Sequence, residues 1–259
     1  MNHTRRVAIV TGAAGGIGRA ICERLLADGL DVLAVDLRAD ADPAPSPAPA
    51  AGSAAAIPFA ADLATGDGNR AVVAEALRRF GRIDVVVANA GVQHVAPVAE
   101  FPEERWRTLL DLLLTSPFLL AKHAWPALVE SPLASFVAVS SAHGLVASPG
   151  KSAYVAAKHG TIGLVKTLAL EGAEHEITAN AVCPGYVRTP LVERQVEALA
   201  ERDGTTPERA LADGLLAPHA IKRLIEPAEV ADVVGLLAGP SGRAFSGAAL
   251  TMDLGWTAR

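Results

Sequence analysis

Cysteine is nearly absent: only Cys22 and Cys183 occur among 259 residues. Both stand in apolar stretches, and neither has a partner at the spacing of a metal-ligand or redox motif, so we expect no metal and a reducing compartment. Long apolar runs are also missing. The run after the basic start stops at Thr11, which is too short for a signal peptide, and no other run reaches the ~18 residues of a membrane span. We therefore predict a cytoplasmic protein with no membrane partner.

The chain has no excess of basic residues. It has 23 Lys and Arg and 28 Asp and Glu, which gives a net charge of −5. Residues of both charges are scattered along the chain. Without a basic stripe, nucleic acid is not an expected partner. Hydrophobic residues make up 51% of the sequence, which is enough to bury one full core, so we expect a single domain over residues 1–259.

Short β-branched runs alternate with longer helical patterns along the chain. The first unit is a strand at 7–10, a glycine turn, a helix at 16–28 and a strand at 32–35, which together form a βαβ unit. Further strands are expected at 57–60, 83–88, 135–139, 178–182 and 249–252. This alternation predicts the α/β class, with a Rossmann-type doubly wound parallel sheet that carries helices on both faces.

Two segments interrupt this alternation. Residues 40–56 are rich in Ala and Pro, and each proline removes a backbone donor and restricts the residue before it, which predicts a surface loop. Residues 204–225 carry Gly, Pro and His between short helical pieces, and a helix is expected before them at 192–200. The region 191–225 is therefore either a substrate lid or a plain surface excursion.

A glycine-rich turn follows the first strand and opens the first helix. Its pattern TGxxxGxG, with Gly12, Gly16 and Gly18, is typical of dinucleotide sites because backbone amides and a helix N-terminus can face a pyrophosphate. Asp36 ends the next strand, where its carboxylate would accept ribose hydroxyls and repel a 2′-phosphate, so NAD is the predicted cofactor. Arg38, two residues later, is then a solvated loop residue; the alternative is that it binds the 2′-phosphate of NADP.

Two later turns complete the predicted nucleotide site. Asp62 either bonds the adenine amino group or caps the helix that begins near Thr65. The small residues that end the fourth strand allow close approach of the backbone. From these turns, the predicted cofactor residues are Thr11, Gly12, Gly16, Ile17, Gly18, Asp36, Asp62, Leu63, Asn89, Ala90 and Gly91.

Tyr154 and Lys158 stand four residues apart in a helix expected at 152–170, so their side chains project from one face. A nearby ammonium stabilises a phenolate and lowers the pKa of the phenol, so the pair can exchange a proton with an alcohol. Ser141, at the end of the fifth strand, can hold the substrate oxygen. These three residues are the predicted catalytic centre of an oxidoreductase that moves a hydride to or from a secondary alcohol.

Together with Pro184-Gly185, these motifs resemble the short-chain dehydrogenase/reductase family over nearly the whole chain. Within that family, the runs 89–98, 141–148 and 151–160 are most similar to the D-3-hydroxybutyrate dehydrogenases. The resemblance implies a homotetramer that reversibly oxidises a small anionic 3-hydroxy acid to the 3-oxo acid with NAD, most specifically (R)-3-hydroxybutyrate to acetoacetate. The alternatives are a family member that acts on another secondary alcohol or ketone, and an NAD-binding protein without turnover.

The resemblance also assigns roles to individual residues. Lys158 would hold the nicotinamide ribose, and Thr189 would bond the carboxamide, within a cofactor segment made of Pro184, Gly185, Val187 and Thr189. The substrate carboxylate would be held by Gln93, His143, Lys151 and Gln195. Tyr186 replaces a tryptophan of the hydroxybutyrate enzymes, so it would line a somewhat larger substrate site.

The chain departs from the family pattern at a fourth catalytic position. The family asparagine seven residues after Trp106 is Leu113 here, and its isobutyl group cannot bond the water that links the lysine to solvent. We therefore expect proton exchange with bulk water to be slower or rerouted. Ala88 and Leu254 also replace the usual asparagine and glycine of their motifs.

Overall fold

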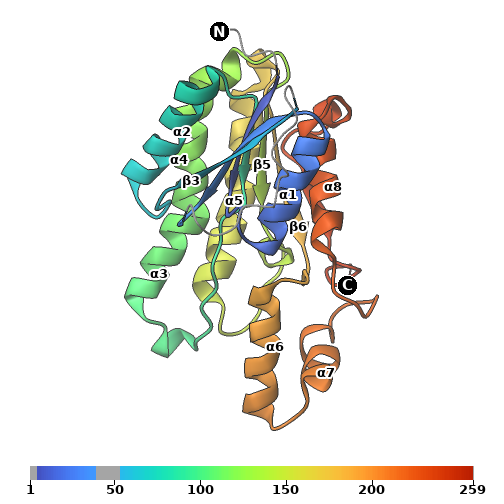
Figure 1. Cartoon of the computed structure of the whole chain (residues 1–259). Coiled ribbons are helices and arrows are strands. Elements are labelled where there is room, and N and C mark those ends of the chain that lie inside the picture. Colours follow the sequence, from blue (N-terminus) through green and yellow to red (C-terminus); the bar gives the residue numbers. More distant parts are fainter. Residues whose placement is uncertain (1–4, 39–52, 259) are drawn as a thin grey trace.

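Within residues 5–38 and 53–258, which the computed structural model describes, seven parallel strands form one sheet (Figure 1). The strands are β1 (Val7–Thr11), β2 (Asp31–Asp36), β3 (Ala56–Ala60), β4 (Val85–Ala88), β5 (Ser135–Val139), β6 (Thr178–Pro184) and β7 (Ala249–Met252). They lie in the order β3-β2-β1-β4-β5-β6-β7. All seven predicted strands are present, so the α/β class and the single-domain doubly wound sheet are confirmed.

Helices cover both faces of the sheet (Figure 1). On one face, α1 (Gly16–Ala27) and α8 (Pro227–Ala238) pack side by side. The other face carries α2 (Gly66–Phe80), α4 (Ser116–Val129) and α5 (Ser152–Glu171). Because both faces are covered, the central strands are apolar runs with nearly every residue buried.

One helical run includes a wider turn. It consists of α3 (Glu103–Leu110), the π-turn η2 (Asp111–Thr115) and α4. Within the described residues, it is the one helical run whose length and composition would allow it to cross a membrane. Its inner side packs on the sheet through Leu120 and Leu128, and 39% of its most apolar window is buried. The core helix of a soluble protein has the same composition, so the run is weak evidence for a span.

The end of the sheet near the predicted site carries two further helices. α6 (Pro190–Asp203) and α7 (Pro207–Arg209) extend beyond the sheet (Figure 1). Val192 and Val196 of α6 form a small apolar cluster with residues that follow α7, among them Leu224. The remaining turns are η1 (Val98–Glu100), η3 (Ala142–Gly144), η4 (Ala173–His175), η5 (Ala210–Leu215) and η6 (Pro240–Ala244). The loop predicted at 40–56 lies mostly outside the described residues, and the lid at 191–225 stays a prediction.

Candidate active site

A cleft of about 1050 Å³ opens at the carboxyl ends of the strands. It lies where the strand order reverses between β1 and β4, which is the usual ligand position in doubly wound folds. The turns after β1 through β6 line it, together with α5 and α6. Every predicted site residue lines this cleft except Thr11.

The glycine turn is closely packed against the end of β4. The amide of Asn89 donates to the Thr11 carbonyl at 2.9 Å through Nδ2, and Thr11 Oγ1 accepts the backbone N–H of Asn89 at 2.9 Å. A Cβ on Gly18 would lie 2.0 Å from the Gly12 carbonyl oxygen, so only glycine fits there. Thr11 and Asn89 thus hold the turn in shape, and the space above it is left for a ligand.

Two carboxylates line the nucleotide end of the cleft. Asp36 accepts the N–H of Ala14 at 3.0 Å, which fixes it beside the glycine turn. Asp62 accepts the N–H of Ala64 at 3.0 Å, while Thr65 is the N-cap of α2. The alternative in which Asp62 caps this helix is therefore wrong. Arg38 is exposed and does not line the cleft.

The predicted catalytic residues meet at the other end of the cleft. Ser141 follows β5 and makes a hydrogen bond with Tyr154 on α5. The ammonium of Lys158 donates to the Val139 carbonyl at 2.7 Å and lies 5.6 Å from the centre of the Tyr154 ring. Burial raises the pKa of Tyr154, the Ser141 bond lowers it, and burial lowers the pKa of Lys158 to about 8. Burial therefore opposes the acidification of the phenol that the sequence predicts.

Leu113 lies in the π-turn between α3 and α4 and is 1% exposed. Its Cδ2 packs 3.2 Å from where a Cβ on Gly91 would stand, and its carbonyl accepts the Thr161 hydroxyl at 3.0 Å. An apolar side chain thus fills the place of the family asparagine, and the main-chain oxygen of this residue already has a donor.

A buried lysine lies in the same cleft as Tyr154. Lys151 precedes α5, is 8% exposed, and donates to the hydroxyl of Tyr186 at 3.2 Å. Burial lowers the pKa of its ammonium. Gln93, in the turn after β4, and Gln195, on α6, line the same cleft. This set of one amine and two amides is suited to binding a small anion.

His143 is 3% exposed between the serine and the outer wall of the cleft. Burial, and then the positive charges of Lys151 and His159, lower its pKa to about 3, so the ring is neutral at physiological pH. Its Nε2 lies 3.0 Å from Ser148 Oγ, and its Nδ1 lies 3.5 Å from Ser141 Oγ. Both ring nitrogens thus have hydroxyl partners.

An aromatic wall that the sequence did not predict closes this end of the cleft. Trp256 stacks on Tyr186 with ring centres 5.4 Å apart, and its ring meets the edge of His143 at 4.9 Å. The C-terminal segment returns to the site through Leu254, whose φ of 54° explains why a glycine is usual there. A single tryptophan beyond the last strand carries no periodic signal, so only the fold reveals its place.

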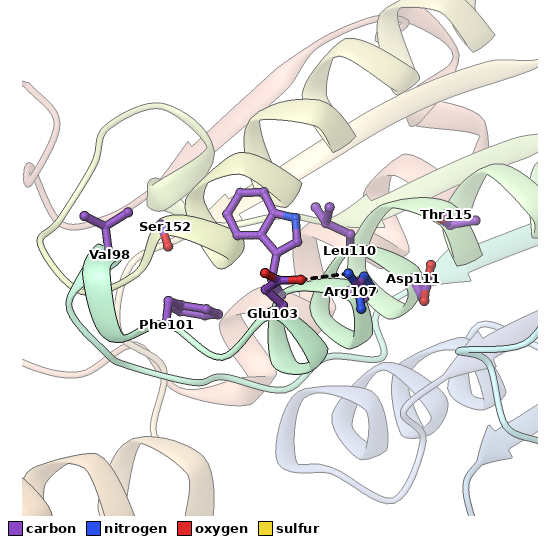
Figure 2. A pocket seen from close by; sticks show the side chains of 9 residues that line it. Val98, Phe101, Glu103, Arg107, Leu110, Asp111, Thr115 and Ser152 are labelled. Atoms are coloured by element: carbon purple, nitrogen blue, oxygen red, sulfur yellow. Dashed lines mark hydrogen bonds and ion pairs between the residues drawn. The ribbon is translucent and has the colours of Figure 1, made fainter.

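A second hollow, of about 660 Å³, lies beside α3 (Figure 2). Figure 2 shows that the Glu103 carboxylate is paired with Arg107, at 2.8 Å. Ser152 also lines this hollow, and its hydroxyl is buried without a hydrogen-bond partner. We assign no chemistry to this hollow.

Comparison with known proteins adds independent information. Residues 6–200 match the family model of the short chain dehydrogenases. The chain is 39% identical to D-beta-hydroxybutyrate dehydrogenase of Cupriavidus necator, over 98% of each chain, and 40% identical to an uncharacterised oxidoreductase of Bacillus subtilis, over 98% of this chain and 99% of that one. Among solved structures, aldohexose dehydrogenase of Thermoplasma acidophilum superposes with a TM-score of 0.86 at 32% identity, over 98% of this chain and 95% of that one.

Proposed function

Because this chain belongs to the short-chain dehydrogenase family, we propose that it is an NAD-dependent enzyme for small 3-hydroxy acids. The specific reaction proposed is the reversible oxidation of (R)-3-hydroxybutyrate to acetoacetate. The observation that carries this proposal is the buried ammonium of Lys151, which stands in the catalytic cleft beside Tyr154 and Tyr186. A neutral alcohol would leave that charge without a partner.

The residues of the nucleotide end fit a nicotinamide dinucleotide. Gly12 and Gly18 line the cleft, and neither leaves room for a Cβ because the turn packs on itself and on the end of β4. Asp36 stands where the adenosine ribose would be expected. The carboxylate of Asp36 supports NAD over the 2′-phosphorylated cofactor. When bound, the nicotinamide supplies the hydride acceptor, and Thr189 and Lys158 are the proposed partners of its carboxamide and ribose.

Three side chains carry the proposed proton chemistry. Ser141 bonds the substrate oxygen and holds it next to the phenol of Tyr154. Tyr154, as phenolate, removes the hydroxyl proton while the hydride leaves the adjacent carbon. Lys158 places a positive charge under the tyrosine ring, which favours the phenolate during this step.

The carboxylate of the acid is proposed to lie on Lys151, with Gln93 and Gln195 as further donors. Lys151 is held in place by the Tyr186 hydroxyl at 3.2 Å, so little of its flexibility is lost when an anion binds. His143 is the fourth residue of the predicted set. It adds no positive charge to attract the carboxylate, because the ring is neutral, and both ring nitrogens already have hydroxyl partners.

Assembly and compartment stay predictions. We propose a homotetramer in the cytoplasm. Apolar side chains that the single chain leaves exposed, among them Trp106, Phe118 and Leu170 at 37%, 46% and 81%, support the assembly of subunits. Light scattering of the purified protein would give its mass and decide the oligomeric state.

The substrate proposal is tested with Lys151→Ala. Loss of a charge-assisted contact is expected to lower kcat/KM for 3-hydroxybutyrate by about 10- to 100-fold, mainly through KM. With a neutral alcohol such as 2-butanol, kcat/KM should change by less than about threefold, a difference of under 1 kcal/mol. Lys122→Ala, on the exposed side of α4, is the matched control. Equal losses on the acid and the neutral alcohol would contradict the carboxylate assignment.

Two other functions predict different results in the same assay. An enzyme for another alcohol or ketone would turn over neutral substrates better than 3-hydroxybutyrate. A protein that binds NAD without turnover would show binding alone, and Leu113 is the feature that favours it. The complete set of Ser141, Tyr154 and Lys158 in one cleft supports turnover.

A further inference from the structure

Hydroxyl and imidazole groups connect Tyr154 with the surface. The Ser141 hydroxyl is near enough to Tyr154 for hydrogen bonding between them to lower the pKa of the phenol. Ser141 Oγ lies 3.5 Å from His143 Nδ1, and His143 Nε2 lies 3.0 Å from Ser148 Oγ. Ser141 and His143 are 7% and 3% exposed, whereas Ser148 is partly open to solvent. The row therefore begins at the reacting phenol and ends at water.

The order of donors along this row follows from the chemistry of the ring. A neutral imidazole carries one N–H and one acceptor nitrogen. If His143 Nδ1 accepts a hydrogen bond from Ser141, then Nε2 donates one to Ser148. Each of the three residues in the row then accepts a proton from one neighbour and can donate a proton to the next. The contact at 3.5 Å is long, and rotation of the Ser141 hydroxyl toward the ring would align it.

On the side of the lysine, Leu113 stands where the family pattern has an asparagine. The Leu113 side chain is apolar and its carbonyl accepts from Thr161. The ammonium of Lys158 donates to the Val139 carbonyl at 2.7 Å. The Leu113 side chain therefore gives the lysine route no acceptor for water, and a second exit would carry the proton of Tyr154 to solvent.

We propose that Ser141, His143 and Ser148 form this exit, a proton relay that exchanges the proton of Tyr154 with solvent. The inference rests on the proposed role of Tyr154 as acid/base. During oxidation, once the Ser141 hydroxyl has turned from the substrate oxygen to His143, the O–H bond of Tyr154 breaks as one forms at Ser141. The Ser141 proton passes to Nδ1, the Nε2 proton passes to Ser148, and Ser148 releases a proton to water. The hydride leaves separately on the nicotinamide, and no charge remains on the relay.

The surroundings of His143 disfavour a protonated ring, so the ring transfers a proton without holding it as an imidazolium. Burial comes first, and then Lys151 and His159, among the causes that act against an imidazolium at His143. The rings of Tyr154 and Tyr186 make T-shaped contacts with it at 5.9 and 6.4 Å between centres. A charged ring would be unfavourable among these groups, so the steps are concerted. Reduction uses the same groups in reverse.

Ser148→Ala and Ser148→Thr test the relay without touching the catalytic residues. In weakly buffered stopped-flow experiments, hydride transfer is followed by the absorbance of the reduced nicotinamide and proton release by a pH indicator. The wild-type protein and Ser148→Thr, which keeps the hydroxyl, should release protons together with hydride transfer. In Ser148→Ala, proton release should lag by about tenfold, at the low end of what a positioned acid or base contributes, and added imidazole should restore it.

Coincident proton release and hydride transfer in Ser148→Ala would overturn the relay. So would a lag that Ser148→Thr shares, since that would make the effect one of packing. Any secondary alcohol that the wild-type protein oxidises serves as substrate, so a failure of 3-hydroxybutyrate counts against the proposed function alone. A wild-type protein that oxidises no alcohol would overturn both.

Discussion

The ammonium of Lys158 lies 5.6 Å from the centre of the Tyr154 ring, and it donates to the Val139 carbonyl rather than to the phenol. Burial raises the pKa of the phenol and lowers the pKa of the amine. Burial thus opposes the phenolate, whereas an amine with a pKa of about 8 is still mostly protonated at pH 7. The Ser141 bond and the positive charge of an oxidised nicotinamide are then needed to favour the phenolate.

Tyr154→Phe removes the acid/base hydroxyl and nothing else. We expect kcat to fall by about 10²- to 10⁴-fold, the usual contribution of a positioned acid or base. Affinity for the reduced cofactor, followed by its fluorescence, should change little, because Tyr154 reaches the nucleotide only at its nicotinamide end. A variant with an unchanged rate would show that another group moves the proton.

Asp36→Asn tests cofactor choice. The amide keeps an oxygen that can accept the Ala14 N–H, at 3.0 Å in the native protein, but it removes the charge that repels a 2′-phosphate. Relief of a repulsion of about 1–4 kcal/mol at contact distance should lower the preference for NAD over NADP by at least about tenfold, measured as the ratio of the two kcat/KM values. An unchanged ratio would place cofactor selection elsewhere.

Gly18→Ala and Gly15→Ala form a matched pair in the glycine turn. A Cβ at Gly18 would lie 2.0 Å from the Gly12 carbonyl oxygen, whereas a Cβ at Gly15 would lie 3.4 Å from the same atom. Gly18→Ala should therefore displace the turn, lower the unfolding free energy by about 1–3 kcal/mol and weaken NAD binding. Gly15→Ala should retain most of both. Calorimetry of unfolding and binding checks this, and equal losses would mean that the turn is not closely packed.

Elements with strong local signals were predictable from the sequence. The helix predicted at 192–200 runs over Pro190–Asp203, because Thr189 caps it by accepting the Val192 N–H at 3.4 Å and Gly204 ends it with a φ of 59°. The cleft and the joint placement of Ser141, Tyr154 and Lys158 followed from the same patterns. These features depend on residues close in sequence and on the parallel sheet.

Features that depend on burial or on distant contacts were not predictable. The raised pKa of Tyr154 comes from its burial, which a spacing of four residues does not reveal. Trp256 reaches Tyr186 only because the C-terminal segment returns to the cleft. The π-turn that holds Leu113 adds one residue to a helical turn, which helical periodicity does not show.

The neutral state of His143 predicts a pH dependence of stability. Burial lowers its pKa from 6.5 to about 3, so below pH 6.5 the unfolded chain takes up a proton that the native protein does not. The stabilisation is complete above pH 6.5 and is lost as the pH falls toward 3. Between pH 7 and 5 it should decrease by about 2 kcal/mol. Urea unfolding of the cofactor-free protein and of His143→Asn at both pH values measures this difference. If the two proteins lose stability in parallel, His143 is protonated in the native state and cannot act as a neutral relay.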